Sequence, residues 1–93
     1  ITLNAFASDR QQLFCDATAG NIVIQLPATP NAFPNATMVE VYKVDAGVNT
    51  VDVNGNGNNI EGAATLAAPL AAQYEAIRLV WSGTEWILNF LNP

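Results

Sequence analysis

Apolar and polar residues alternate with a period of two in several short segments of this chain. Such alternation is typical of β-strands with one buried face, and the Gly, Pro and Asn residues between the segments mark turns. The pattern predicts six strands, over residues 13–17, 22–26, 38–44, 50–53, 74–81 and 85–90. We therefore expect a single all-β domain over residues 1–93, built as a small antiparallel β-sandwich or jelly-roll-like module.

One face of each predicted strand carries the larger apolar side chains. The expected core positions are Ile22, Ile24, Leu26, Val39, Val41, Val51, Val53, Ile77, Leu79, Trp81, Trp86, Leu88 and Phe90. Segment 27–36 is rich in proline, which lacks an amide donor, so it is expected to be an ordered crossover loop. Segment 61–73 favours helix through its alanines, but Pro69 interrupts it. We expect a short strand at 64–67 there, followed by a loop.

The stretch DATAGNIVIQLPA, residues 16–28, combines a turn, a strand and a proline stop. Asp16 and Thr18 are expected to hydrogen-bond to backbone amides of the turn, since short polar side chains do so readily. Gly20 is expected to adopt a positive φ that a side chain would disfavour. Pro27 ends the strand. The stretch predicts a structural corner and no chemistry.

The stretch WSGTEW, residues 81–86, predicts a tight hairpin in which Gly83 takes a positive φ. Its two strands bring Trp81 and Trp86 close together, and we expect both rings in the core. The alternative is a ligand or interface platform, in which exposed Trp81, Trp86 or Tyr74 would stack on sugars.

Residues 52–63, DVNGNGNNIEGA, match the first six positions of a calcium-binding loop through Asp52, Asn54, Asn56 and Gly57. The match fails at position twelve, where Ala63 replaces the glutamate that would close the coordination sphere. A β-connection is the simpler interpretation, because Asn and Gly accept the left-handed conformation that tight turns need. We predict neither a metal site nor a cofactor.

Composition narrows the function further. Charged residues make up 12% of the chain, about half the usual share, and the net charge of −5 provides no basic stripe for nucleic acid. No apolar run is long enough to span a membrane. The absence of histidine excludes a Ser-His-Asp triad, and Cys15, the single cysteine, is expected to be a buried, inert thiol. The eight carboxylates could include a glycosidase-like pair, but we expect a protein that is not an enzyme.

Several weak motifs occur in a fixed order, namely CDATAGNIVIQLPA, MVEVYKVDAGVNTVDVNGNGNNIEGAATL and QYEAIRLVWSGTEWIL. Together they resemble a small β-module found in tail-fibre, tailspike and other virion-surface proteins of tailed bacteriophages. The matching positions are Asp16, Thr18, Gly20, Leu26, Pro27, Lys43, Asp45, Val51, Val53, Gly57, Ile60, Gly62, Gly83 and Trp86. The resemblance implies a non-enzymatic module on the virion, in a tail fibre, a tailspike or a head-decoration protein, that is commonly trimeric and contacts other virion proteins.

Physical chemistry independently favours some oligomer, because a 93-residue chain without disulfide or zinc has a small core and few charges to solvate its surface. We expect a homotrimer, the number coming from the resemblance. Its contacts are predicted at the valine faces of 39–41 and 51–53 or at the aliphatic stretch 66–70. The alternative function is a glycan-binding, receptor-recognition module whose partner would be a host surface glycan.

Overall fold

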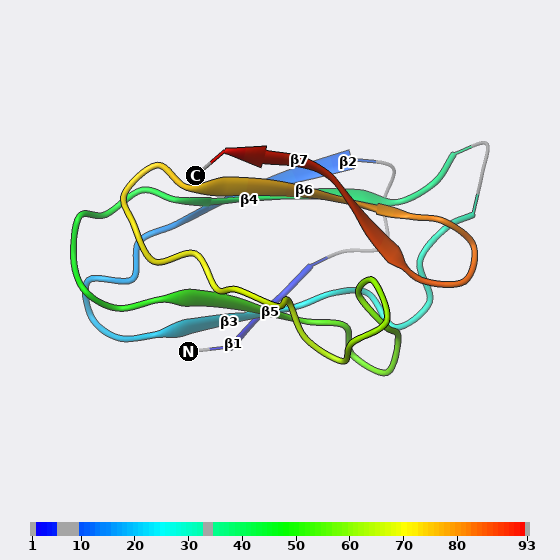
Figure 1. The fold of residues 1–93 in the computed structure, drawn as a ribbon, viewed down its shortest axis with the longest axis horizontal. Helices are drawn as coiled ribbons and strands as arrows, with labels where there is room; N and C mark the ends of the chain where they lie inside the picture. Colours follow the sequence, from blue (N-terminus) through cyan, green and yellow to red (C-terminus); the bar gives the residue numbers. More distant parts are fainter. Residues whose placement is uncertain (1, 6–9, 33–34, 93) are drawn as a thin grey trace.

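The computed structural model describes residues 2–5, 10–32 and 35–92, with the side chains of 90–92 excluded. Seven strands form two sheets that lie face to face (Figure 1). The three-stranded sheet has the order β1 (Thr2–Asn4), β3 (Ile22–Gln25), β5 (Val51–Asn54). The four-stranded sheet has the order β2 (Arg10–Cys15), β4 (Met38–Lys43), β6 (Ala76–Trp81), β7 (Trp86–Asn92). The predicted all-β, two-sheet class is confirmed.

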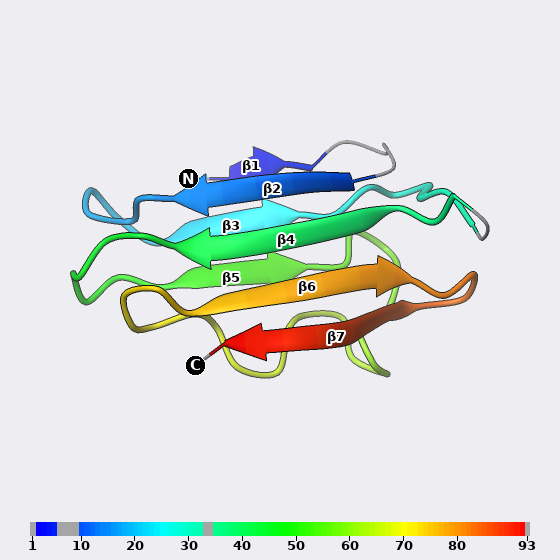
Figure 2. The same cartoon turned by 90° about the horizontal axis from the view of Figure 1, so that it is seen from above.

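From β1 to β5 the chain passes alternately between the two sheets. Each sheet therefore receives every second strand, and the pairs β1–β3, β3–β5 and β2–β4 are parallel (Figure 2). We call β1 with β2 the first coil and β3 with β4 the second coil. β3 lies in the three-stranded sheet and β4 in the four-stranded sheet, so the connection that contains the proline-rich segment 27–36 is a crossover, as expected. Residues 33 and 34 of this segment lie outside the described part.

The prediction of an antiparallel sandwich or jelly roll is wrong in its strand directions. Of the five strand pairs in the described residues, only β4–β6 and β6–β7 are antiparallel. The physical reason is the coiled path: a strand that returns to the same sheet after a full coil enters from the same side as its predecessor and runs the same way.

The core fills the space between the sheets. The predicted core positions on β3 to β6, together with Leu26 and Trp86, are all buried, whereas Leu88 is partly buried. The side chain of Phe90 lies outside the described part. Cys15 is buried as expected. Strand β1 was not predicted, because its three residues are too few to establish an alternation.

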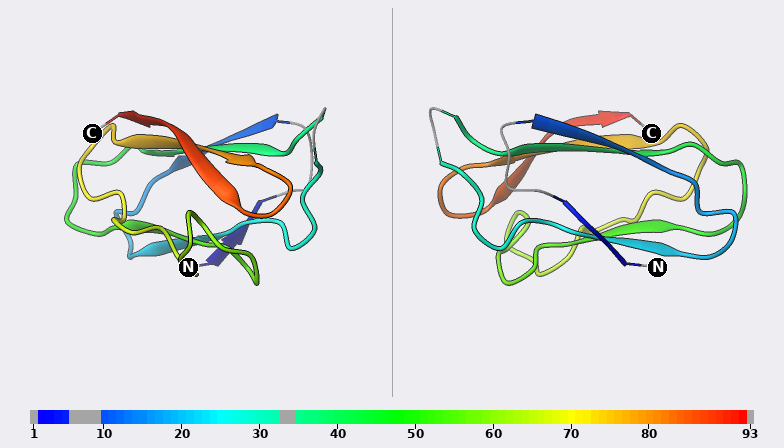
Figure 3. Two further views of the ribbon diagram at one scale, coloured as in Figure 1. Left: turned by 45° about the vertical axis from the view of Figure 1, so that its right-hand side comes forward. Right: turned by 180° about the vertical axis from the view of Figure 1, so that it is seen from behind.

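After β5 the coiled path ends. Residues 64–70 turn back along β5, where single antiparallel bridges join Asn54 to Thr65 and Val51 to Leu70. The chain then crosses to β6, which runs antiparallel to β4 (Figure 3). The strand predicted at 64–67 is thus reduced to one bridge and the hydrogen bond from Leu66 N to Val53 O (2.9 Å).

Candidate functional site: the outer face of the four-stranded sheet

The outer face of the four-stranded sheet presents apolar and aromatic side chains to solvent. Phe14 on β2 and Tyr42 on β4 are register neighbours, and their rings stack with centroids 5.1 Å apart and planes inclined by 29°. Phe14 is 66% exposed. The residues that alternate outward on this sheet are Arg10, Gln12, Phe14, Met38, Glu40, Tyr42, Arg78, Val80 and Ile87.

A fixed ion pair lies in the middle of this outer face. Glu40, only 5% exposed, accepts hydrogen bonds from Gln12 Nε2 (2.9 Å) and Arg78 Nε (3.0 Å). The Arg78 guanidinium also pairs with the same carboxylate at 2.9 Å. The Gln12 amide and then Arg78 lower the pKa of Glu40, so it stays charged. The carboxylate in the middle of this face is therefore already neutralised, and the other outward residues include the apolar Met38, Val80 and Ile87.

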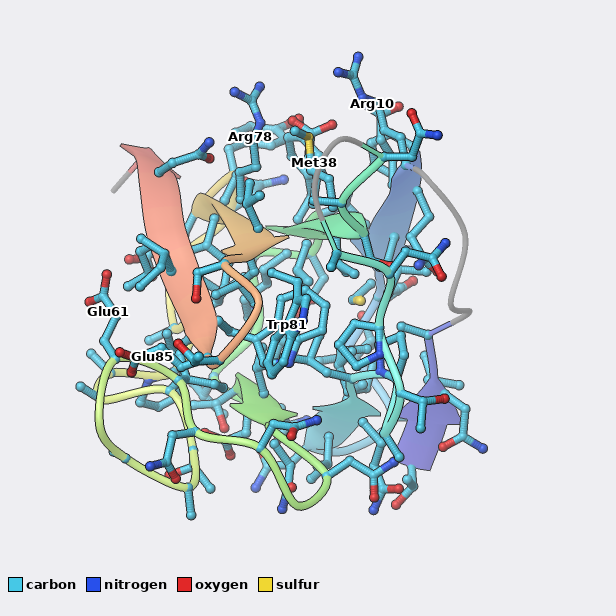
Figure 4. All side chains as sticks on the ribbon, turned by 90° about the vertical axis from the view of Figure 1, so that its right-hand side faces the viewer. Arg10, Met38, Glu61, Arg78, Trp81 and Glu85 are labelled. Carbon is cyan, nitrogen blue, oxygen red and sulfur yellow. The ribbon has the colours of Figure 1, made fainter. Side chains whose placement is uncertain are left out.

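Two of the three cationic residues of the chain, Arg10 and Arg78, lie on this same face. Figure 4 shows both side chains projecting away from the sheet on either side of Met38. Aromatic, methionine and arginine side chains are enriched in the centres of protein interfaces. This face has that composition. Sequence reasoning missed this face, because the strand predicted at 13–17 begins at Arg10 in the structure and ends at Cys15. The overlooked signal was that Phe14, Met38 and Tyr42 are apolar or aromatic at positions that alternate with the core residues.

The third cation, Lys43, is completely buried and faces inward. Its ammonium donates three hydrogen bonds, to Asp45 Oδ2 (3.0 Å), the Asp45 carbonyl (2.9 Å) and the Gly47 carbonyl (3.0 Å). Asp45 Oδ1 accepts the Ala17 amide at 2.8 Å, and this bond together with Lys43 holds the pKa of Asp45 at about 2. Lys43 and Asp45 therefore fasten the corner that follows β4, residues 44–50, to the corner that follows β2, residues 16–21.

The corner at residues 16–20 matches its prediction only in part. Asp16 Oδ1 accepts the Thr18 amide at 3.0 Å, as expected, and it also accepts the Thr18 hydroxyl. The positive φ expected of Gly20 is wrong: its φ is not in the left-handed region, and an added Cβ would meet nothing within 4 Å. A bond from Gly20 N to the Ala17 carbonyl (3.1 Å) closes the turn without that conformation. Pro27 is buried just beyond β3.

The loop that resembled a calcium site uses its asparagines to join the coils. Asn54 Oδ1 accepts the Asn56 amide (2.7 Å), and Asn56 Nδ2 donates to the Leu26 carbonyl (3.1 Å). Asn58 Nδ2 donates to the Ala28 carbonyl (3.0 Å). Asn56 and the following Gly57 have positive φ values of 54° and 95°, as expected for a turn.

Among the described residues, no group of three or more His, Cys, Asp or Glu side chains gathers as a metal site would require. Gly62 in the same loop also has a positive φ, of 87°. Sequence reasoning missed Gly55, which has the tightest surroundings of the glycines: a Cβ there would lie 1.8 Å from the Asn58 carbonyl oxygen.

The tryptophan pair lies inside the molecule. The rings of Trp81 and Trp86 meet edge to face, with centroids 5.4 Å apart, and Gly83 between them has the expected positive φ, of 106°. Trp86 is fully buried and Trp81 is 9% exposed. Figure 4 shows Trp81 between the two sheets. Tyr74 is exposed but precedes β6, whereas Trp81 ends it. The three aromatic residues therefore do not form one sugar platform.

Cys15, Glu61 and Glu85 have structural roles. Burial raises the pKa of the Cys15 thiol, which favours its unreactive protonated form. Glu61 Oε2 accepts the Leu88 amide (3.0 Å), and Glu85 Oε1 accepts the Gly62 amide (2.8 Å). Figure 4 shows these two carboxylates beside β7. They fasten segment 60–62 to the start of β7.

The fold and this face define a two-layer, all-β protein with a coiled parallel half and an outward apolar sheet face. A scan of protein-family models matches none to the chain, and a search of curated proteins finds no match either. The described residues contain no helix long and apolar enough to cross a membrane.

Proposed function

We propose that this chain is a non-enzymatic structural module of a tailed-bacteriophage virion surface, as a piece of a tail fibre or tailspike or as a head-decoration protein. It assembles as a homotrimer and contacts other virion proteins. The virion assignment rests on the ordered motifs of the sequence. The observation that carries the assembly role is the outer face of the four-stranded sheet.

The predicted trimer contacts need a correction. Val39, Val41, Val51 and Val53 are fully buried within one chain, and Leu66 and Leu70 at the ends of the aliphatic stretch are buried as well. These side chains have no surface left for a second copy, because the coiled path packs the two sheets against each other. We therefore place the contact between copies on the outer face of the four-stranded sheet.

The opposite surface of the molecule supports this orientation. The outward positions of the three-stranded sheet, those that alternate with its buried residues, are mostly polar: Thr2, Asn4, Val23, Gln25, Asp52 and Asn54. Such side chains remain hydrated without penalty, whereas the stacked pair of Tyr42 and the 66% exposed Phe14 gains from being covered. The trimer accordingly turns the four-stranded sheet inward and the three-stranded sheet outward.

Light scattering or native mass spectrometry on the purified chain tests the proposal. Three copies of the 9.9 kDa chain give about 30 kDa. Phe14→Glu is expected to dissociate the assembly and leave a folded monomer. Val48→Glu is the matched control, because Val48 is apolar and 95% exposed but lies outside the proposed contact. A folded wild-type monomer at micromolar concentration would contradict the trimer.

A further inference from the structure

We infer that the first coil is a docking end for one further parallel coil, and that the chain acts as the terminating cap of a coiled stack. The occupant is a strand–corner–strand segment that adds a parallel strand to β1 and another to β2. This inference does not use the outer face of the four-stranded sheet, so it stands or falls separately from the trimer.

Strands β1 and β2 are the outermost strands of their sheets, and both lie at the same end of the molecule (Figure 2). Among the described residues, no strand or isolated bridge pairs with the outer edge of either strand. The second coil offers equivalent edges, through β3 and β4, and these bind β1 and β2 in parallel register. The outer edges of β1 and β2 are therefore equivalent to the edges of β3 and β4 on which the first coil itself is bound.

The core is also unfinished at this end. Leu3 is in register with Ile24 and Leu13 with Val41, so both leucines take inward positions. Ile24 and Val41 are fully buried, yet Leu3 is 40% exposed and Leu13 is only partly buried. The leucines lack the neighbouring coil that buries Ile24 and Val41.

The corner of the first coil repeats half of a bonding pattern. In the second coil, one Asp45 oxygen accepts the amide two residues later, from Gly47, and the other accepts Ala17 N of the preceding coil. Asp16 accepts the amide two residues later, from Thr18, through Oδ1. Within the described residues its Oδ2 has no hydrogen-bond partner. Asp16 is thus placed to accept a main-chain amide from an added corner.

The other end of the molecule is closed against such an addition. Segment 59–61 covers the beginning of β7: Trp86 N donates to the Asn59 carbonyl (2.9 Å), Glu61 N to the Trp86 carbonyl (3.0 Å), and Leu88 N to Glu61 Oε2 (3.0 Å). A register shift in the β6–β7 pair further interrupts the regular ladder. Segment 64–70 covers β5 in the same way. Natural sheets protect their edges by such bulges and covering loops, which β1 and β2 lack in the described residues.

A fusion tests the inference directly. A second copy of residues 22–50, which supplies a sheet strand, a crossover, a second strand and a corner, is placed directly ahead of Thr2. We expect the amides of β1 and β2 to gain protection from hydrogen exchange and the urea m-value to rise by about a third, in proportion to the added folded chain. The matched control carries the same copy at the C-terminus of the chain, after β7, where it should stay unprotected with an unchanged m-value.

A variant pair separates specific docking from general stabilisation. Leu3→Ser should lower the urea midpoint more in the N-terminal fusion than in the original chain, because the added coil buries Leu3. Val48→Ser, at a 95% exposed corner position, should act equally in both. An added coil that exchanges like an unfolded chain would overturn the inference. So would equal effects of Leu3→Ser, or a wild-type dimer that already protects β1 and β2. A monomer that accepts the coil contradicts the trimer alone.

Discussion

Replacing Trp86 by phenylalanine should leave the stability nearly unchanged, although Trp86 is the largest fully buried side chain. The reason is its indole N–H. In the described part of the chain, Nε1 of Trp86 is the one buried side-chain polar atom without a hydrogen-bond partner. Phenylalanine removes that donor while keeping an aromatic ring against Trp81.

The opposing contributions to the free energy of unfolding are of similar size. The smaller ring leaves a void of roughly 40 Å³, which at about 24 cal/mol per Å³ costs about 1 kcal/mol. The lost apolar area costs about 1 kcal/mol more. Removing a buried N–H that has no partner returns about 1–3 kcal/mol. Trp86→Phe should therefore change the free energy of unfolding by no more than about 1 kcal/mol.

Urea unfolding followed by circular dichroism measures this change for Trp86→Phe and for Trp81→Phe. The second variant loses the same ring volume but relieves no unpartnered N–H, so it should cost about 2 kcal/mol. A loss above about 2 kcal/mol in Trp86→Phe would show that Nε1 makes a stabilising contact in solution, and the reasoning would fail.

Three further outcomes follow from the structure. Gly55→Ala should prevent folding, as its Cβ would lie 1.8 Å from the Asn58 carbonyl oxygen, whereas Gly20→Ala should melt like wild type by circular dichroism. The pKa of Asp45, about 2 instead of 3.8, means that its stabilisation is complete above pH 4 and lost as pH falls towards 2. In the Asp45→Asn variant, the urea midpoint should therefore fall less between pH 5 and pH 2 than it does in the wild type. A chelator should leave the melting temperature unchanged, because the asparagine amides of loop 54–58 already bond to the backbone; a fall of many degrees would refute this.

Alternation of apolar residues predicted most strands and most of the core, because burial on one face leaves a direct mark on the sequence. It missed the core residues outside regular strands, such as Ile60, Leu66 and Leu70. It could not predict strand direction. The corners 16–21 and 44–50 are short connections of the kind that also join antiparallel neighbours, yet each carries the chain to the opposite sheet. The same period-two pattern serves parallel and antiparallel partners, so the topology had to come from the structure.

The candidate site was harder to predict than the fold. The sequence directed attention to Trp81, Trp86 and Tyr74, which the fold separates or buries. The stack of Phe14 on Tyr42 depends on the register of β2 against β4, two strands joined by no local connection. Single-sequence patterns do not contain that pairing.

The parallel coils also set an order of folding. Thr2 pairs with Val23 and Arg10 with Met38, so each such ladder must first close a loop of many residues. The β6–β7 hairpin closes across only residues 82–85, at a much smaller entropic cost. Yet β6 and β7, the two strands of this hairpin, are the last of the seven strands to leave the ribosome. We expect the chain to order from its C-terminal strands towards its N-terminal ones, with the edges of β1 and β2 the last to find partners.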